Sequence, residues 1–371
     1  MRLCLIGPMP PFRGGIARYC YLLARELEKR HDLLVLSYRR QYPPLLYGSK
    51  PQIDPDVDRA SVQAEFRNLS FDLDSADPRS WRRTAAAIAD FNPDAVILPW
   101  WVVYWAPMYL YLLRALKRRG IKVLFLCINV FEHEDNLLKK LLTKSVLRQT
   151  PSMIVHSAQE KQEILQFHPG ARVAMHLLPL FDYPSPKPAK PHRELHLLFF
   201  GFVRPYKGLD VLLNAMAQLE DRDVVLKIAG EFWKDEEQYR RQVAELGIAE
   251  RVEIVEGYIP EQQMGEYFSW ADVVVLPYKK SRTSGIIATA YGYGKPVLAT
   301  RVGGFGDNID DGGSGRLVAP NDPQALAEGI RWFLEHRDLD FAGNIERFTR
   351  KSMSWASLAD AIEEKIAAPR R

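Results

Sequence analysis

Cysteine is scarce in this sequence, and no long apolar run is present. The three cysteines, Cys4, Cys20 and Cys127, lie in apolar segments without the spacing of metal ligands. We therefore expect reduced thiols in the core of a cytoplasmic protein rather than disulfides. The densest apolar stretch, residues 96–113, is interrupted by two prolines. Neither it nor the short apolar run at the amino terminus has the length of a membrane span or a signal peptide, so we expect neither.

An excess of charge of one sign is also absent. Lys and Arg total 50, Asp and Glu total 46, and the formal net charge is +4. This balance is too even for a dedicated nucleic-acid binder, so no nucleic-acid partner is expected. The 371 residues, 47% of them hydrophobic and 26% charged, fit a globular chain of about two domains.

Apolar strand-like runs alternate with amphipathic helix-like segments in both halves of the chain. In the first half we expect strands at 3–6, 33–37, 95–98, 123–128 and 152–156, and helices at 16–29 and 112–119. In the second half we expect strands at 195–201, 224–229, 252–256, 273–276 and 296–299, and helices at 208–219, 235–246, 261–269, 285–292 and 323–335. The alternation predicts an α/β fold whose parallel sheets are covered on both faces.

A proline-rich segment separates the two halves. Residues 183–191 contain four prolines and can sustain neither a helix nor a central strand. We therefore predict two Rossmann-like, doubly wound domains at 1–168 and 193–345, joined by a linker at 169–192 and facing each other across a cleft. Ligands of such sheets bind beyond the carboxyl ends of the strands, so the loops that follow strands are the expected sites.

The loop after the first strand ends in Gly14-Gly15, which opens the first helix. Two adjacent glycines let the backbone approach a ligand closely, and a helix amino end favours an anion. The Gly-x-Gly-x-x-Gly sequence of dinucleotide-binding proteins is absent. An ordinary turn explains this loop equally well.

The second loop of interest follows strand 195–201 and carries Gly201, Arg204 and Lys207. Both cations leave the strand end in the direction of the expected cleft. Arg as a fork and Lys as a point charge suit a diphosphate. The alternative is a solvated loop with two routine cations.

The third loop follows strand 273–276, and Ser284 is a natural N-cap for a helix that begins at Gly285. The first amides of that helix, near Gly285 and Ile286, are expected to bind phosphate oxygens. Thr289, one turn further along the helix, is expected on its cleft side.

Several sequences in these loops resemble a known family. They are the Lys-Gly-Leu-Asp turn at 207–210, the Ala-Asp-Val-Val-Val-Leu-Pro run at 271–277, and Gly-Lys-Pro-Val at 294–297. They resemble the donor domain of the retaining glycosyltransferase family 4, which has the GT-B fold, and the likeness spans nearly the whole chain. It implies a glycosyltransferase that moves a sugar from a nucleotide diphosphate donor to a glycan or lipid-linked acceptor, with retention of configuration. It also implies that a helix at 346–371 packs back onto the first domain.

The chain departs from the family pattern at two places. Members carry two glutamates eight positions apart around the third loop, where this chain has Ser281 and Thr289. Their arginine five residues before the lysine is replaced by Phe202, and Arg204 is the expected substitute. Thr289 still offers a hydroxyl to a ribose, whereas Ser281 is too short to replace a carboxylate.

The mechanism implied by the resemblance needs no metal. Arg204, Lys207 and the amides of residues 284–286 are expected to stabilise the charge that develops on the leaving diphosphate. The acceptor attacks from the same face, and the leaving phosphate takes its proton. Asp72-Leu-Asp74 has the pattern of metal-dependent transferases but lies in a segment without a cleft signal. We therefore expect no cofactor.

Candidates for contact with the sugar or the acceptor follow strands of the first half. His133 follows strand 123–128 and has a counterpart in the family against the donor sugar or acceptor, although packing on Phe131 is the alternative. Asn129 and Glu134 share this location. Trp101 lies in a tryptophan-rich loop after another strand, and its ring suits either a sugar or the core.

Residues 136–148 alternate leucines with Lys and Arg in a helical pattern. Such a helix is either half-buried or bound to an anionic membrane surface, as a peripheral protein at the inner face of the membrane would be. Two other functions stay open. A sugar-nucleotide epimerase shares the fold but needs acid–base carboxylates, and a non-catalytic nucleotide-sugar-binding partner needs no glutamate pair.

Overall fold

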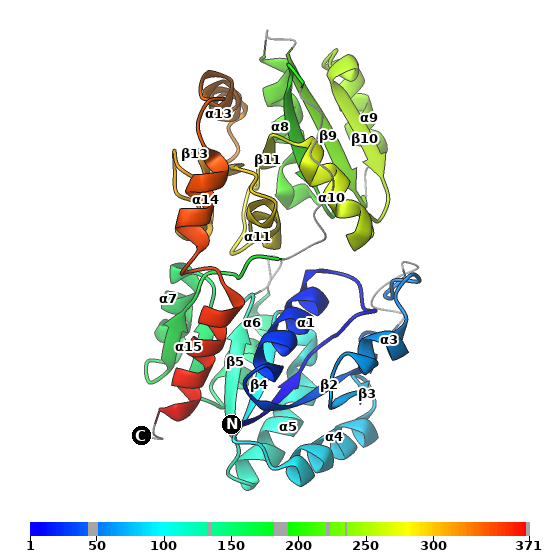
Figure 1. The fold of residues 1–371 in the computed structure, drawn as a ribbon, viewed down its shortest axis with the longest axis vertical. Helices are drawn as coiled ribbons and strands as arrows, with labels where there is room; N and C mark the ends of the chain where they lie inside the picture. The colour runs from blue at the N-terminus through cyan, green and yellow to red at the C-terminus, as the bar shows by residue number, and fades with distance from the viewer. Residues whose placement is uncertain (44–50, 132–135, 182–191, 220–222, 234–235, 369–371) are drawn as a thin grey trace. The chain divides into compact units, whose positions relative to one another are not determined.

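The computed structural model describes residues 1–43, 51–131, 136–181, 192–219, 223–233 and 236–368, and Figure 1 shows its elements. The chain divides into two compact units. Unit 1 comprises Met1–Leu177 and Ser354–Arg371, and unit 2 comprises Leu178–Met353. None of the helices that the structure describes is both long enough and apolar enough to cross a membrane.

Unit 1 is built on a parallel sheet of seven strands in the order β3-β2-β1-β4-β5-β6-β7. The strands are β1 (Arg2–Ile6), β2 (Asp32–Arg40), β3 (Leu69–Asp74), β4 (Ala95–Trp100), β5 (Lys122–Cys127), β6 (Ser152–Val155) and β7 (Arg172–Met175). The helices are α1 (Gly15–Glu28), α3 (Arg59–Ala64), α4 (Pro78–Phe91), α5 (Ala106–Arg118), α6 (Leu137–Leu147), α7 (Ala158–Phe167) and α15 (Trp355–Ala367). The register of the central strands places Cys4 of β1 opposite Leu34 of β2 on one side and Val96 of β4 on the other.

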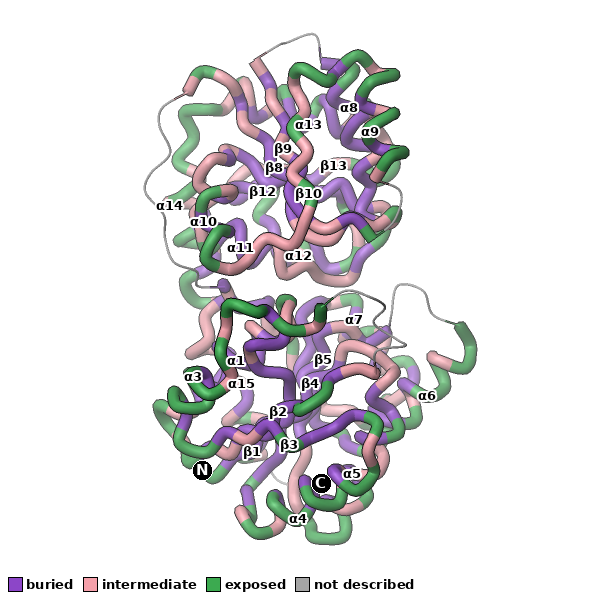
Figure 2. The backbone as a smooth tube through the Cα atoms, turned by 90° about the vertical axis from the view of Figure 1, so that its right-hand side faces the viewer, coloured by how far each residue is buried: buried purple, intermediate pink, exposed green. Residues whose placement is uncertain are grey.

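The sheet of unit 1 is buried because its central strands are apolar on both faces. Every residue of β4 is buried, as is every residue of β6, and the three cysteines are buried free thiols. Figure 2 shows the same pattern in both units, with buried strands inside and exposed helix surfaces outside. The carboxyl-terminal helix α15 packs on α1, where the rings of Tyr19 and Trp355 lie 5.2 Å apart.

Unit 2 has a parallel sheet of six strands in the order β10-β9-β8-β11-β12-β13. The strands are β8 (Leu195–Phe200), β9 (Val224–Gly230), β10 (Val252–Glu256), β11 (Val273–Leu276), β12 (Val297–Thr300) and β13 (Gly315–Val318). The helices are α8 (Leu209–Ala217), α9 (Glu236–Glu245), α10 (Glu261–Trp270), α11 (Gly285–Gly292), α12 (Phe305–Asn308), α13 (Pro323–Glu335) and α14 (Phe341–Thr349), and a 3₁₀ turn, η2, covers Pro205–Lys207.

The predicted α/β class, with two parallel sheets, is confirmed, but some elements differ from expectation. Helix α5 begins at Ala106 rather than 112 because Pro107 lies in its first turn, where proline needs no hydrogen-bond partner. Strand β3 and helix α4 have no counterpart among the predicted elements, and strand β13 is a further addition. Strand β7 lies inside the segment that we expected to be linker.

Candidate active site

The loops after β8 and β11 lie side by side because the strand order of unit 2 reverses between these two neighbouring strands. Such a switch point is where open parallel sheets bind ligands. The loops are also joined directly. The Lys279 N–H donates to the Tyr206 carbonyl at 2.8 Å, and the Lys279 ammonium lies 2.7 Å from Asp210. The second and third predicted loops therefore form one site.

Lys207 is the most unusual residue of this site. Its side chain extends from η2, and the residue is only 8% exposed. A Cβ built on Gly201 would lie 3.6 Å from both the Lys207 Nζ and the Ile286 Cδ1, and the Tyr278 ring centroid is 5.5 Å from the ammonium. Within the described part of the chain, no carboxylate pairs with this ammonium. The charge therefore lies between the end of β8 and the start of α11, and no carboxylate of the described residues pairs with it.

Burial changes the acidity of this ammonium. It lowers the pKa of Lys207 from 10.5 to about 8; the nearby Tyr206 opposes the shift and the charge of Arg204 adds to it. Burying an unpaired charge costs free energy, so a protein keeps one only where it serves a purpose. A bound anion would restore the protonated form by supplying the missing negative charge.

The backbone around Lys207 depends on glycine. Gly208 has a φ of +70° and lies against the Pro277 carbonyl, where any Cβ would overlap the oxygen. Only glycine fits this conformation and this close approach. The Lys-Gly-Leu-Asp sequence thus brings the β8 loop into contact with the β11 loop and fixes the direction of Lys207.

Arg204 lies toward β9, on the side of β8 away from β11 and Lys207. Its guanidinium carbon lies 4.3 Å from the ring centroid of Trp233, which belongs to the loop after β9. The bridge between Val203 and Phe232 aligns these two loops. A cation–π contact holds Arg204 without consuming its hydrogen-bond donors. The two predicted cations therefore share one loop but lie toward different neighbours, β9 for Arg204 and β11 for Lys207.

Ser284 caps α11 as predicted. Its Oγ accepts the N–H of Ile286 at 3.3 Å, and the hydroxyl of Tyr278 lies 3.5 Å away. Burial raises the pKa of Tyr278 to about 12, so this phenol stays neutral. The amino end of α11, with its partial positive charge, thus lies beside the Lys207 ammonium.

Thr289, which we expected to offer its hydroxyl to a ribose, is almost completely buried. It is 1% exposed, and its hydroxyl donates to the Gly285 carbonyl at 3.0 Å. Ser281 is also buried and donates to the Thr283 carbonyl at 3.0 Å. Serine and threonine bond in this way to nearby carbonyls of their own segment. The structure therefore gives no support to a ribose contact by the Thr289 side chain.

The remaining predicted residues belong to unit 1. Gly14 has a φ of +102°, precedes α1, and has open space where a Cβ would stand; Gly15 begins the helix. Asn129 follows β5 and is half-buried. His133 and Glu134 lie outside the described residues.

The three tryptophans at and after the end of β4 differ in burial. Trp100 and Trp105 are buried in the core of unit 1. Trp101 is half-buried, and its Nε1–H donates to the Tyr42 hydroxyl at 3.2 Å. Since β1 and β4 are the neighbours between which the strand order of unit 1 reverses, Gly14 and Trp101 follow strands at its switch point.

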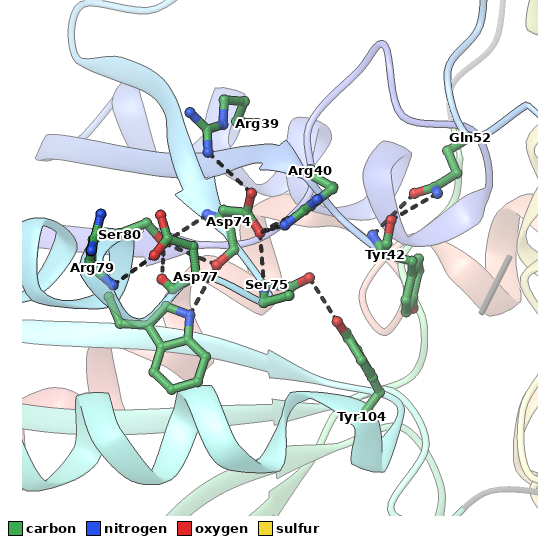
Figure 3. A network of polar contacts seen from close by, with 12 residues as sticks. Arg39, Arg40, Tyr42, Gln52, Asp74, Ser75, Asp77, Arg79, Ser80 and Tyr104 are labelled. Carbon is green, nitrogen blue, oxygen red and sulfur yellow. Dashed lines mark hydrogen bonds and ion pairs between the residues drawn. The ribbon is translucent and has the colours of Figure 1, made fainter. Parts of the chain in front are cut away.

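Sequence reasoning missed several residues that the structure brings to these edges. Trp233 and Tyr278 contact the two cations, and their positions after β9 and β11 were the available signal. A polar network at the ends of β2 and β3, with Arg40 and Asp74 at its centre, was missed because β3 was not predicted (Figure 3).

Comparison with known families agrees with this arrangement. Residues 13–179 match the profile described as Glycosyltransferase Family 4, and residues 194–336 match the profile described as Glycosyl transferases group 1. The chain belongs to glycosyltransferase family 4. The first match covers most of unit 1, and the second contains Lys207 and the loops around it.

Individual relatives of this family 4 chain are distant. The D-inositol 3-phosphate glycosyltransferase 1 of Catenulispora acidiphila is 30% identical over 213 residues, which cover 52% of this chain and 50% of that protein. The D-inositol 3-phosphate glycosyltransferase of Streptomyces coelicolor is 29% identical over 259 residues, which cover 62% of this chain and 56% of that protein. The chain thus spans about half the length of the curated relatives it matches.

Solved structures show the same fold over the full length. Anabaena HepE in complex with UDP has a TM-score of 0.75 at 16% identity, covering 99% of this chain and 100% of that one. The sucrose-phosphate synthase of Thermosynechococcus elongatus has a TM-score of 0.73 at 19% identity, covering 98% and 97%. At such identities the likeness concerns the fold alone, which is the GT-B fold of glycosyltransferases.

Proposed function

We propose that this chain transfers a sugar from a nucleoside diphosphate donor to a glycan or lipid-linked acceptor, with retention of the anomeric configuration. The observation that carries the proposal is the buried ammonium of Lys207 beside the amino end of α11, without a carboxylate among the described residues. This arrangement suits a diphosphate, which supplies the missing negative charge. Membership of family 4 supports the reaction class, and relatives solved with UDP and UDP-glucose support the donor class.

Departure of the nucleoside diphosphate defines the task of this site. The bond between the anomeric carbon and the phosphate oxygen breaks, and negative charge develops on that oxygen. Lys207 and the amides at Gly285 and Ile286 stabilise this charge, and Arg204 adds its guanidinium from the β9 side. Because these groups are fixed before the reaction begins, they pay no reorganisation cost in the transition state.

The acceptor hydroxyl attacks the anomeric carbon from the face that the diphosphate leaves. The new bond joins the acceptor oxygen to this carbon, and the hydroxyl proton passes to the leaving phosphate oxygen. No protein base is required, which is consistent with the absence of glutamates at positions 281 and 289. The α11 amides take over part of the lost donor contacts in this variant of the site.

The unit 1 candidates complete the proposal. Gly14 and Gly15, at the start of α1, contribute to donor binding, whereas Asn129, His133, Glu134 and Trp101 are the candidates for contact with the sugar or the acceptor. Helix α6 adds a membrane contact, since Leu137, Leu138, Leu141 and Leu142 are 74%, 66%, 56% and 38% exposed beside several lysines. A lipid-linked acceptor would be reached from such a surface.

A donor screen tests the proposal. Thermal melts with UDP, GDP, ADP and dTDP sugars should reveal a preferred nucleotide through a rise in melting temperature that depends on concentration. The preferred donor is then incubated with acceptor mixtures, and release of the nucleoside diphosphate is measured. If no nucleotide sugar stabilises the chain at millimolar concentration, the proposed function is wrong.

A further inference from the structure

The carboxyl ends of β2, β3 and β4 lie at the same edge of the unit 1 sheet. Strands β3, β2, β1 and β4 are successive neighbours in the sheet. Arg39 and Arg40 end β2, Asp74 ends β3, and Tyr104 lies in the turn after β4 (Figure 3). This edge is the one at which open parallel sheets bind ligands. The mechanism proposed above uses none of these side chains.

Asp74 is a fixed anchor at this edge. Its side chain is 3% exposed, and its main-chain carbonyl accepts the Trp81 Nε1–H at 2.9 Å. Its carboxylate accepts the Ala76 N–H at 3.0 Å. Burial by itself raises the pKa of Asp74, but the bonds from Ala76 and the two arginines hold it below its ordinary value. The carboxylate is therefore ionised and immobile.

Two arginines converge on this single carboxylate. Arg40 donates to the Asp74 Oδ1 through Nη2 at 3.0 Å and Nε at 3.2 Å, and Arg39 donates to Oδ2 through Nη2 at 3.2 Å. Their side chains stay 46% and 57% exposed. A guanidinium has five N–H donors, so most of those on both residues remain for a ligand. The group carries one more positive than negative charge.

Elsewhere in this sheet a single arginine pairs with a carboxylate of the neighbouring strand. At the amino ends of β1 and β2, Arg2 pairs with Asp32 at 3.2 Å, and both side chains are about half exposed. A second guanidinium beside a buried carboxylate gives instead an oriented, cationic fork. Phosphates are bound by forks of this kind.

An aromatic shelf adjoins the arginines. It consists of Tyr42, Trp101 and Tyr104, all half-buried, with the Tyr42 and Tyr104 rings 5.3 Å apart and the buried Trp105 behind them. The Tyr104 hydroxyl lies 2.9 Å from the hydroxyl of Ser75, the residue after Asp74. The shelf is thus joined to the arginine group, and aromatic faces suit sugar rings.

We propose that the acceptor is a phosphorylated sugar, whose phosphate binds Arg40 and Arg39 while its ring lies on the shelf of Tyr42, Trp101 and Tyr104. Asp74 is the positioning residue that orients both guanidinium groups. Calling this ligand the acceptor rests on the proposed function, whereas the binding of a phosphorylated sugar to unit 1 does not depend on it. The phosphate belongs either to a soluble sugar phosphate or to the headgroup of a lipid.

Calorimetric titration of the full chain tests this site. The chain is first saturated with the tightest-binding of UDP, GDP and ADP, so that the Lys207 site is occupied. It is then titrated with glucose, with glucose 6-phosphate, and with vesicles containing phosphatidylinositol. We expect at least one phosphorylated probe to bind at least tenfold more tightly than glucose. The soluble and vesicle arms distinguish the two sources of the phosphate.

Variants assign the binding to the arginines. Arg40→Gln should weaken the phosphorylated probe by about tenfold or more, as loss of a charge-assisted fork does. Arg39→Gln, which breaks a single bond to Asp74, repeats the test if Arg40→Gln fails to fold. Arg2→Gln removes an arginine of the same exposure from the opposite edge and should change nothing.

Two results would overturn the inference. One is equal affinity for glucose and for both phosphorylated probes, and the other is a phosphate preference that survives in both arginine variants. Failure of every nucleoside diphosphate to bind would count against the proposed function instead. The same titration on Lys207→Gln, in which the other cationic site is weakened, would then still decide the inference.

Discussion

Burying an ammonium group without a carboxylate partner destabilises a folded protein, and Lys207 is buried without such a partner among the residues that the structure describes. The cost depends on pH. Below pH 8 both the folded and the unfolded chain hold the proton, so the full cost applies. Between pH 8 and 10.5 the folded chain loses the proton while the unfolded chain keeps it, so stability rises with pH.

Lys207→Met should therefore raise the melting temperature most below pH 8, with the gain shrinking toward pH 10. The same variant should lower transfer by roughly 100-fold, because it removes one partner of the developing oxyanion.

In the wild type, donor affinity should decline above pH 8 as the free ammonium loses its proton. Melts, donor titrations and initial rates across pH 6–10 measure all three effects.

Lys227→Met is the matched control for this residue. Lys227 lies on β9 of the same sheet, pairs with Glu253 at 3.0 Å, and is 17% exposed in its side chain. Its loss should leave transfer and donor affinity unchanged. Transfer by Lys207→Met within a few-fold of wild type would show that the diphosphate binds elsewhere.

For single residues, the sequence allowed us to predict which side chains belong to the candidate site, but not which side chains they contact. Arg204 and Lys207 stand where a strand signal ends, so their location followed from the alternation of elements. The stacking of Arg204 on Trp233 depends on which strand lies beside β8, a tertiary fact that local sequence does not contain. The burial of Thr289 likewise depends on how α11 is rotated against its unit.

At the scale of a single element, the amino end of α11 combines two roles: Ser284 caps the helix, and the amides beside it are proposed to bind the diphosphate. Ser284→Ala should lower the free energy of unfolding by about 1 kcal/mol, since the Ile286 N–H loses its acceptor. Ser284→Asp keeps a capping oxygen and should hold or slightly raise stability, but it places a negative charge where the diphosphate binds. Donor affinity should therefore collapse in the Asp variant and change much less in the Ala variant.

Asp322 provides the comparison for this element. It caps α13 in the same unit through a 3.0 Å bond from the Ala325 N–H. Asp322→Ala should cost about as much stability as Ser284→Ala without changing donor affinity. Thermal melts and calorimetry on the three variants separate capping from binding. Unchanged donor affinity in Ser284→Asp would show that α11 does not hold the phosphates.

Helix α6 raises a different question at this scale, because its leucines face solvent. Replacing Leu137, Leu138, Leu141 and Leu142 by serine should cost little stability, since these side chains are exposed. The variant should lose flotation with vesicles that contain anionic lipid. Leu339→Ser, at a leucine 36% exposed in unit 2, is the control and should still float. Wild-type chain that fails to float with anionic vesicles would contradict the membrane contact.

For the whole molecule, the parallel order of strands was predictable and the complete set of strands was not. Fully apolar runs such as Val273–Leu276 identify buried parallel strands directly. Strand β3 alternates polar and apolar residues at the end of its sheet, and β13 is interrupted by Arg316, so neither has that signature. Because β3 was not predicted, Asp74 was considered only as part of an Asp-Leu-Asp sequence without a cleft signal, and its pairing with Arg39 and Arg40, which follow the predicted strand 33–37, was missed.

In unit 2, the proposed diphosphate site and a group of possible metal ligands lie at opposite ends of β8. Its carboxyl end leads to Gly201 and Lys207. At its amino end His192, Glu194 and His196 form the metal-ligand geometry found among the described residues, and the two imidazole rings stack 3.5 Å apart. At about 3.3 Å per residue, the six residues of β8 separate these places by roughly 20 Å. A cation at the histidines would therefore be too distant to neutralise the diphosphate.

Transfer should accordingly survive chelation. Cationic side chains and helix amides carry out the charge stabilisation that a metal supplies in other transferases, so rates in EDTA should stay within about twofold of those in Mg²⁺ or Mn²⁺. Melting curves recorded in the same buffers detect any ion at the histidines, because binding to the folded chain alone raises the melting temperature. His196→Gln should abolish such a shift without altering transfer. Complete loss of transfer in EDTA, with recovery on adding Mg²⁺, would refute stabilisation of the leaving group by Lys207, Arg204 and α11 alone.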